Sequence, residues 1–238
     1  AGASGAGKCS ATACSSASSP VRSFAESTHT ALNDVSSASG CTAAGKSALL
    51  STAMRTEALC AAAMTRGELI LTRCEPSHMT GFLPVLESMG CRIYPYGGGK
   101  LYVNCPKRLT APPTIRTMPY PGFPTDIQAL FTAVCAAAEG TSVFVETIFE
   151  NRYRHIPELI RLGASIKVEG RVAVVQGVER LSGAKLCAGE LRGGAALVTA
   201  ALAAEGTSEI SGVGYIDRGY ESIEKALRSV GADITRSG

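Results

Sequence analysis

The stretch ALFTAVCAAAEG at residues 129–140, followed by SVFVETI at 142–148, decides the fold that the sequence predicts. An Ala-rich helix ends at a Gly, and a short apolar strand comes directly after it. The same pattern recurs as LCAAAMTRG at 59–67, before ELILTRC, and as ALVTAALAAEG at 196–206, before SEISGVG. Self-similarity at regular intervals indicates one supersecondary unit used three times.

A second helix follows each of these strands and also ends at a Gly. From the first Gly to the second, the separations are 23, 23 and 25 residues (67 to 90, 140 to 163, 206 to 231). These second helices place apolar residues at i, i+3, i+4 and i+7, so each buries one stripe. Paired strands with tight Gly turns come next and indicate hairpins. Three units of helix, strand, helix, strand, strand share one core by packing around a common axis. We therefore predict an α/β domain with pseudo-threefold symmetry.

The chain divides into two unlike parts. Residues 1–57 are dominated by Ala, Ser, Gly and Thr, a composition that buries too little surface to offset the entropy of ordering. We expect a low-complexity segment there, either disordered or not a native translation of the gene, and a folded domain at 58–238. GCTAAGKS at 40–47 fits the phosphate-loop pattern, but no strand precedes it, so we interpret the match as chance.

The bulk composition excludes several functional classes. The net charge is only +3 and Lys and Arg form no long run, so nucleic acid is not an expected partner. No apolar stretch is long enough to span a membrane and the N-terminus lacks a signal-peptide pattern, so we expect a cytoplasmic protein. The 9 cysteines are scattered without metal-ligand spacing, which favours reduced, mostly buried thiols and no metal site.

Four longer motifs carry a resemblance to a known family. They are MPYPGFPTDIQALF at 118–131, ETIFENRYRHIPELIRLGA at 146–164, ELRGGAALV at 190–198 and YIDRGYESIE at 215–224. In this order and spacing they resemble the second domain of the UDP-N-acetylglucosamine 1-carboxyvinyltransferase family of enolpyruvyl transferases. The resemblance implies two domains, each of three units with helices inside and sheets outside, of which this chain carries one.

The resemblance also implies a reaction and its partners. The enolpyruvyl group of phosphoenolpyruvate passes to the 3-hydroxyl of UDP-N-acetylglucosamine and phosphate leaves, without a metal or cofactor. This is the first committed step of peptidoglycan precursor synthesis, and hence part of cell-wall biogenesis, cell shape and cell division. Because the family site lies between two domains, the chain needs a first domain as a further partner.

Asp126 and Ile148 are the first two residues to which the resemblance assigns a role. Asp126 in FPTD matches the proposed general base at the sugar hydroxyl, whereas its place before a helix also fits a capping residue. Ile148 in ETIF matches a position whose backbone contacts the nucleotide sugar, and by its pattern alone it is an ordinary residue at the end of a strand.

Three arginines and a glutamate complete the predicted site. Arg152, Arg192 and Arg218 match the family's active-site arginines, and guanidinium groups near helix starts suit an anionic substrate. Taken singly, each would be interpreted as a solvated surface arginine. Glu190 stands where the family usually has Asp, so its longer side chain need not reach the same partner.

Other features depart from the family pattern. MRTEALCAAA at 54–63 keeps Arg55 and Glu57 but lacks the family's Thr-Gly-Thr segment, and Cys41 is only a poor match to the family's loop cysteine. Two alternatives therefore stay open: a non-catalytic module that binds a UDP-sugar or a partner, and a relative of the enzyme that makes 5-enolpyruvylshikimate 3-phosphate.

Overall fold

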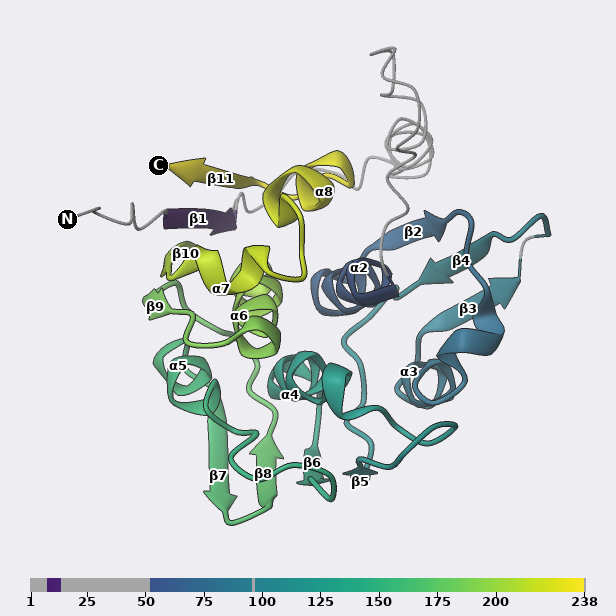
Figure 1. Cartoon of the computed structure of the whole chain (residues 1–238), viewed down its shortest axis with the longest axis horizontal. Coiled ribbons are helices and arrows are strands. Elements are labelled where there is room, and N and C mark those ends of the chain that lie inside the picture. Colours follow the sequence, from purple (N-terminus) through teal and green to yellow (C-terminus); the bar gives the residue numbers. More distant parts are fainter. Residues whose placement is uncertain (1–7, 14–51, 96, 238) are drawn as a thin grey trace.

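Three helices form the centre of the molecule. The computed structural model describes residues 8–13, 52–95 and 97–237. Helices α2 (Thr52–Thr65), α4 (Gln128–Ala137) and α6 (Leu191–Ala203) contact one another, and other elements surround them (Figure 1). In α4 every residue from 128 to 136 is buried. A helix that is apolar on all sides belongs in a core. The repeated Ala-rich segments therefore occupy the centre of the molecule.

The remaining elements follow in three groups along the chain. The first group contains β2 (Glu68–Leu71), η1 (Pro76–Met79), α3 (Leu83–Ser88), β3 (Arg92–Pro95) and β4 (Leu101–Asn104). The second contains β5 (Thr114–Arg116), η2 (Thr125–Ile127), β6 (Thr141–Val145), α5 (Ile156–Arg161), β7 (Ser165–Glu169) and β8 (Val172–Gln176). The third contains β9 (Lys185–Cys187), β10 (Gly206–Ser211), α7 (Val213–Asp217), α8 (Ile223–Ser229) and β11 (Ile234–Ser237).

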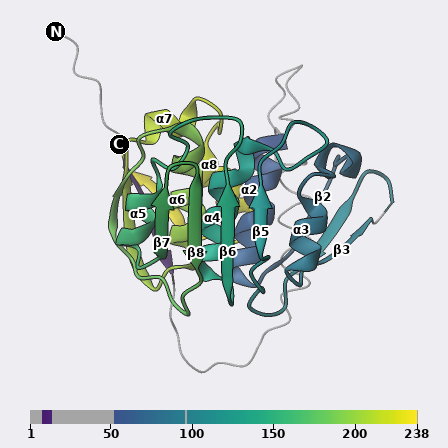
Figure 2. The same ribbon diagram turned by 90° about the horizontal axis from the view of Figure 1, so that it is seen from below.

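The strands form three separate sheets outside the central helices. In the first sheet β4 lies between β2 and β3, antiparallel to both, and in the second β8 lies in the same way between β6 and β7. Figure 2 shows the second sheet, β5-β6-β8-β7, as one layer in front of the helices. The predicted hairpins are thus present. The helices before them end at glycines with positive φ, for example 94° at Gly163, a conformation that favours glycine.

The third sheet takes its central strand from the N-terminal part of the chain. Strand β1 (Lys8–Ala13) is antiparallel to β10 on one side and to β11 on the other, in the order β11-β1-β10-β9. It occupies the place that β4 and β8 have in their sheets. Strand pairing uses backbone groups that every residue except proline offers in full, so a segment poor in apolar residues can fill this place.

This strand changes the predicted division of the chain. The sequence placed no ordered element in residues 1–57, yet β1 lies there, and α2 begins at Thr52, so the expected boundary between 57 and 58 falls inside a helix. The phosphate-loop match at 40–47, and Cys41 within it, lie outside the described residues. No helix in the described part of the chain is both long and apolar enough to cross a membrane.

Candidate active site

Asp126 is the centre of a charged cluster on the surface. It lies in η2, immediately before α4, and its side chain is 56% exposed. Arg152 Nη2 donates to Asp126 Oδ1 at 2.8 Å, and Arg192 Nη2 donates to Oδ2 at 3.1 Å. One carboxylate therefore binds two guanidinium groups that are far from it in sequence. The structure brings three of the predicted site residues together.

The alternative interpretation of Asp126 as a helix cap is wrong. Neither η2 nor α4 has a side-chain hydrogen bond at its N-cap. The turn of η2 places the carboxylate beside the two arginines, and its oxygens bind these instead of backbone N–H groups. Arg192 lies in the first turn of α6, so the N-terminal ends of α4 and α6 meet at this cluster.

A buried glutamate fixes the loop that carries Arg152. Glu146 is 1% exposed and follows β6. Its carboxylate accepts hydrogen bonds from the hydroxyls of Thr117 and Thr125, at 2.9 Å each, and from the backbone N–H groups of Ile148 and Phe149. Thr125 directly precedes Asp126. Glu146 thus joins the segment of the candidate base to the loop of the arginine.

Ile148 lies on this same loop and is partly exposed. Ile148 is 37% exposed, and Phe149 beside it is 50% exposed. The guanidinium carbon of Arg152 lies 5.2 Å from the centroid of the Phe149 ring, within the range of a cation–π contact. The loop therefore presents apolar surface next to the charged cluster.

Arg218 and Glu190 do not take part in the hydrogen bonds of the Asp126 cluster. Arg218 is exposed at the C-cap of α7, next to Gly219, which packs against Leu191 at the start of α6. It therefore lies at the same end of α6 as Arg192, but in the described residues no hydrogen bond or ion pair joins it to Asp126.

Glu190 is directed toward a buried histidine instead. It is the N-cap residue of α6, and its Oε1 lies 3.8 Å from Nδ1 of His155. His155 is 3% exposed, and within the described residues neither of its ring nitrogens has a hydrogen-bond partner. This contact could not be predicted from the sequence, because His155 lies at the start of α5 and only the packing of α5 on α6 brings the two side chains together.

A second buried carboxyl lies beneath the cluster, between α2 and α6. Glu57 is 0% exposed, and Thr199 Oγ1 donates a hydrogen bond to its Oε1. Burial raises the pKa of Glu57 from 4.5 to about 8, while the Thr199 hydrogen bond and the charge of Arg192 act in the opposite direction. Tyr220 is also buried, and its ring centroid lies 6.0 Å from the guanidinium carbon of Arg192. Arg192 therefore has a buried acidic side chain behind it and Asp126 in front of it.

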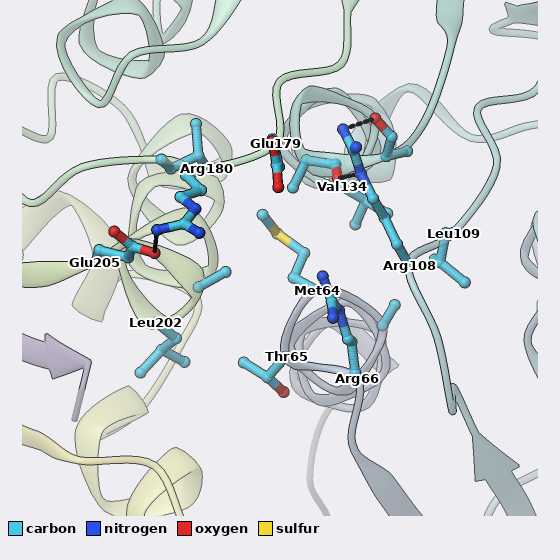
Figure 3. A pocket seen from close by; sticks show the side chains of 15 residues that line it. Met64, Thr65, Arg66, Arg108, Leu109, Val134, Glu179, Arg180, Leu202 and Glu205 are labelled. Atoms are coloured by element: carbon cyan, nitrogen blue, oxygen red, sulfur yellow. Dashed lines mark hydrogen bonds and ion pairs between the residues drawn. The ribbon is translucent and has the colours of Figure 1, made fainter. Parts of the chain in front are cut away.

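A cavity at the other end of the central helices is separate from this cluster. It has a volume of about 500 Å³ and is lined by the C-terminal ends of α2, α4 and α6 (Figure 3). Arg108 donates to the carbonyls of Ala137, Ala138 and Val178, and Arg180 pairs with Glu205 at 3.1 Å. None of the residues predicted from the sequence for the site lines this cavity.

In the described residues no group of His, Cys, Asp or Glu side chains is placed to hold a metal ion. The chemistry available at the Asp126 cluster is that of a carboxylate base and of guanidinium donors for anions.

Comparison with known proteins identifies relatives of the described domain. The family model for EPSP synthase (3-phosphoshikimate 1-carboxyvinyltransferase) matches residues 52–227. UDP-N-acetylglucosamine 1-carboxyvinyltransferase 2 of Caldanaerobacter subterraneus is 53% identical over 178 residues, which cover 75% of this chain and 42% of the relative. The UDP-N-acetylglucosamine 1-carboxyvinyltransferase of Gloeobacter violaceus is 50% identical, with 75% and 39% covered. The chain thus spans about two fifths of the length of these curated relatives.

Solved structures give the same result for the fold. The enolpyruvyl transferase NikO from Streptomyces tendae superposes with a TM-score of 0.68 at 27% identity, covering 78% of this chain and 44% of that chain. An EPSP synthase from Acinetobacter baumannii superposes with a TM-score of 0.62 at 16% identity, covering 78% of this chain and 47% of that chain, and shows a shared fold alone. The α/β fold class predicted from the sequence is confirmed.

Proposed function

Because the chain belongs to the EPSP synthase (3-phosphoshikimate 1-carboxyvinyltransferase) family, we propose that it is the larger part of one domain of an enolpyruvyl transferase that acts on UDP-N-acetylglucosamine. The enolpyruvyl group of phosphoenolpyruvate is transferred to the 3-hydroxyl of the sugar, and phosphate is released. Curated relatives with this activity in their names are 46–53% identical to the chain. The solved EPSP synthase is only 16% identical, which favours the nucleotide sugar as acceptor.

The observation that supports this proposal best is the position of Asp126 between two arginines on an exposed surface. Its carboxylate is the candidate base that accepts the proton of the sugar hydroxyl as the oxygen attacks C2 of phosphoenolpyruvate. Arg152 and Arg192 orient the carboxylate and offer N–H donors to the phosphate and carboxylate of phosphoenolpyruvate. Elimination of phosphate from the adduct then restores the double bond of the enolpyruvyl group.

The remaining predicted residues have secondary roles in this proposal. Ile148 contributes its backbone to the nucleotide-sugar site, and Arg218 contributes a further cation at the same end of α6. Glu190 acts at the start of α6, where it faces His155. Each role is an expectation from the family resemblance, and the open surface around Asp126 is compatible with all of them.

The proposal also requires a further part of the enzyme. The relatives are more than twice as long as the matched segment, and an enclosed site needs a second surface that aligns the two substrates and excludes water. We assign the acid that protonates the methylene carbon to that part. The cytoplasmic location and the roles in peptidoglycan synthesis, cell shape and division belong to the same proposal.

Phosphate release from phosphoenolpyruvate in the presence of UDP-N-acetylglucosamine tests the proposal. The chain alone is expected to show almost no turnover, and addition of a separately produced first domain from a relative is expected to raise it. Asp126→Asn should then lower the restored rate by about 10²–10⁴-fold, the usual contribution of a general base. Asp233→Asn is the matched control, because Asp233 is an exposed aspartate next to β11.

Two results would contradict this assignment. Full turnover by the chain alone would show that no second part of the enzyme is required. An unchanged rate in Asp126→Asn would show that Asp126 is not the base. Binding of UDP-N-acetylglucosamine without turnover, even with the first domain present, would favour the non-catalytic binding module.

A further inference from the structure

Two buried cysteines face each other at the end of the first sheet. Strands β3 and β4 are antiparallel, and Arg92 pairs with Asn104 in their register. Cys91 precedes Arg92 and Cys105 follows Asn104, so the two cysteines form the next opposed pair. Their exposed fractions are 5% and 0%. Both side chains therefore lie on the inner face of the sheet, the face that also buries Ile93 and Val103.

The backbone hydrogen bonds place this pair where opposed side chains come closest. The N–H of Cys105 donates to the carbonyl of Gly67, next to β2, and the N–H of Cys91 donates to the carbonyl of Leu86. Neither amide is used between the two cysteines, so they form a non-hydrogen-bonded pair. At such pairs the Cα atoms are about 4.5 Å apart, which is within the range of about 4.4–6.8 Å that disulfides require.

The side chains meet as this backbone geometry predicts. The two Sγ atoms lie 2.6 Å apart, and the residues are separated by 14 positions in sequence. The contact with Cys91, together with burial, raises the pKa of the Cys105 thiol well above its usual range. Cys105 is therefore a thiol and not a thiolate at neutral pH, and its reaction in the folded chain is slow.

We propose that Cys91 and Cys105 are a modification site that closes to an intramolecular disulfide when a two-electron oxidant such as hydrogen peroxide is supplied. The peroxide oxidises one thiol to a sulfenic acid and releases one water molecule. The sulfur of the second thiol then attacks the sulfenic sulfur, the S–S bond forms, and the sulfenic oxygen leaves as a second water molecule. Two electrons and two protons pass from the thiols to the peroxide.

Other cysteines in the described part of the chain provide internal references. Cys60 and Cys135 are buried, and no sulfur contact as close as that of Cys91 and Cys105 is found at either of them. Cys187 is exposed and reports that the oxidant has reacted with the protein. The proposal rests on the sheet geometry and is independent of the proposed enzymatic function.

Peptide mapping without reduction tests the proposal directly. The purified chain is treated with hydrogen peroxide well beyond the time at which the exposed Cys187 is fully oxidised, because the buried pair reacts more slowly, and the remaining thiols are then alkylated before digestion. We expect a cross-linked pair of peptides that contains Cys91 and Cys105, with a loss of two hydrogen masses, and its disappearance after dithiothreitol. Closing a loop of this length is expected to raise the Tm by roughly 6–12 °C.

Variants separate this site from random oxidation. Cys91→Ser and Cys105→Ser should each abolish the cross-link and the rise in Tm, whereas Cys135→Ser should keep both. If a serine variant does not fold, the wild-type peptide map still decides. Recovery of Cys91 and Cys105 as free thiols after this prolonged oxidation, or recovery of either one linked mainly to another cysteine, would overturn the proposal.

Discussion

Replacing Glu57 by Gln is expected to flatten the pH dependence of folding stability. The buried carboxyl has its pKa raised from 4.5 to about 8, and burial is the largest cause. In the unfolded chain the carboxyl regains its ordinary pKa, so between these two values the folded chain binds more protons than the unfolded chain. The contribution of Glu57 to stability is therefore fully present below about pH 4.5 and is lost as the pH rises through about 8.

The size of the effect follows from the same shift. One pKa unit corresponds to about 1.4 kcal/mol, so the change from 4.5 to about 8 amounts to about 5 kcal/mol over the whole range. Between about pH 5 and about pH 9 the linkage relation gives a loss of about 4 kcal/mol for this group. Gln has nearly the same shape and keeps an acceptor for Thr199 Oγ1, but it does not titrate.

Urea unfolding followed by far-ultraviolet circular dichroism measures this prediction. The free energy of unfolding is determined at several values from about pH 5 to about pH 9 for the wild-type chain, Glu57→Gln and Glu87→Gln. Glu87 is an exposed glutamate on α3, so its variant is expected to keep the wild-type slope. Equal slopes for the wild type and Glu57→Gln, in a variant that is folded at both ends of the range, would refute the assignment of a protonated carboxyl at position 57.

Three further substitutions, one of them with a matched control, test the packing and the site. Gly177→Ala should destabilise the chain by at least about 2 kcal/mol, because its Cβ would lie 1.8 Å from the carbonyl oxygen of Ala138, whereas Gly214→Ala meets no atom within 4 Å and should change stability by less than about 1 kcal/mol. Glu146→Gln should cost about 1–3 kcal/mol in urea unfolding, because the amide cannot accept all four hydrogen bonds. Asp126→Asn should change stability by less than about 1 kcal/mol, because its ion pairs are exposed; a larger loss would indicate a structural role.

Much of the fold could be predicted because its signals are local. The Ala-rich helices, their closing glycines and the hairpins each depend on residues within one or two turns of the chain. The hairpin predicted after the second helix of the second unit is formed by β7 and β8, and the predicted second helix of the third unit is α8. Strand β1 could not be predicted, because its small residues KCSATA carry no alternation of apolar side chains. It is ordered by the backbone edges of β10 and β11, which are distant in sequence.

The candidate site, like the fold, could be predicted from the sequence only in part. Asp126, Arg152 and Arg192 could be chosen from their motifs, but that one carboxylate binds both arginines depends on how α4 packs against α6. The roles of Glu146 and His155 were not visible, because a glutamate after a strand and a histidine before a helix are ordinary in sequence.

The sequence alone therefore determined the Ala-rich helices, the hairpins, their repetition and the family, since periodicity, glycine caps and motifs are properties of neighbouring residues. Only the tertiary structure decided which distant groups are buried together and which of them form hydrogen bonds or contacts. Separate segments of the chain pack together and exclude water from the space between them. This packing buries Glu57 beside Thr199 and Arg192, and it places Cys91 opposite Cys105. Desolvation and contact of this kind depend on distance in space, which the order of residues does not specify.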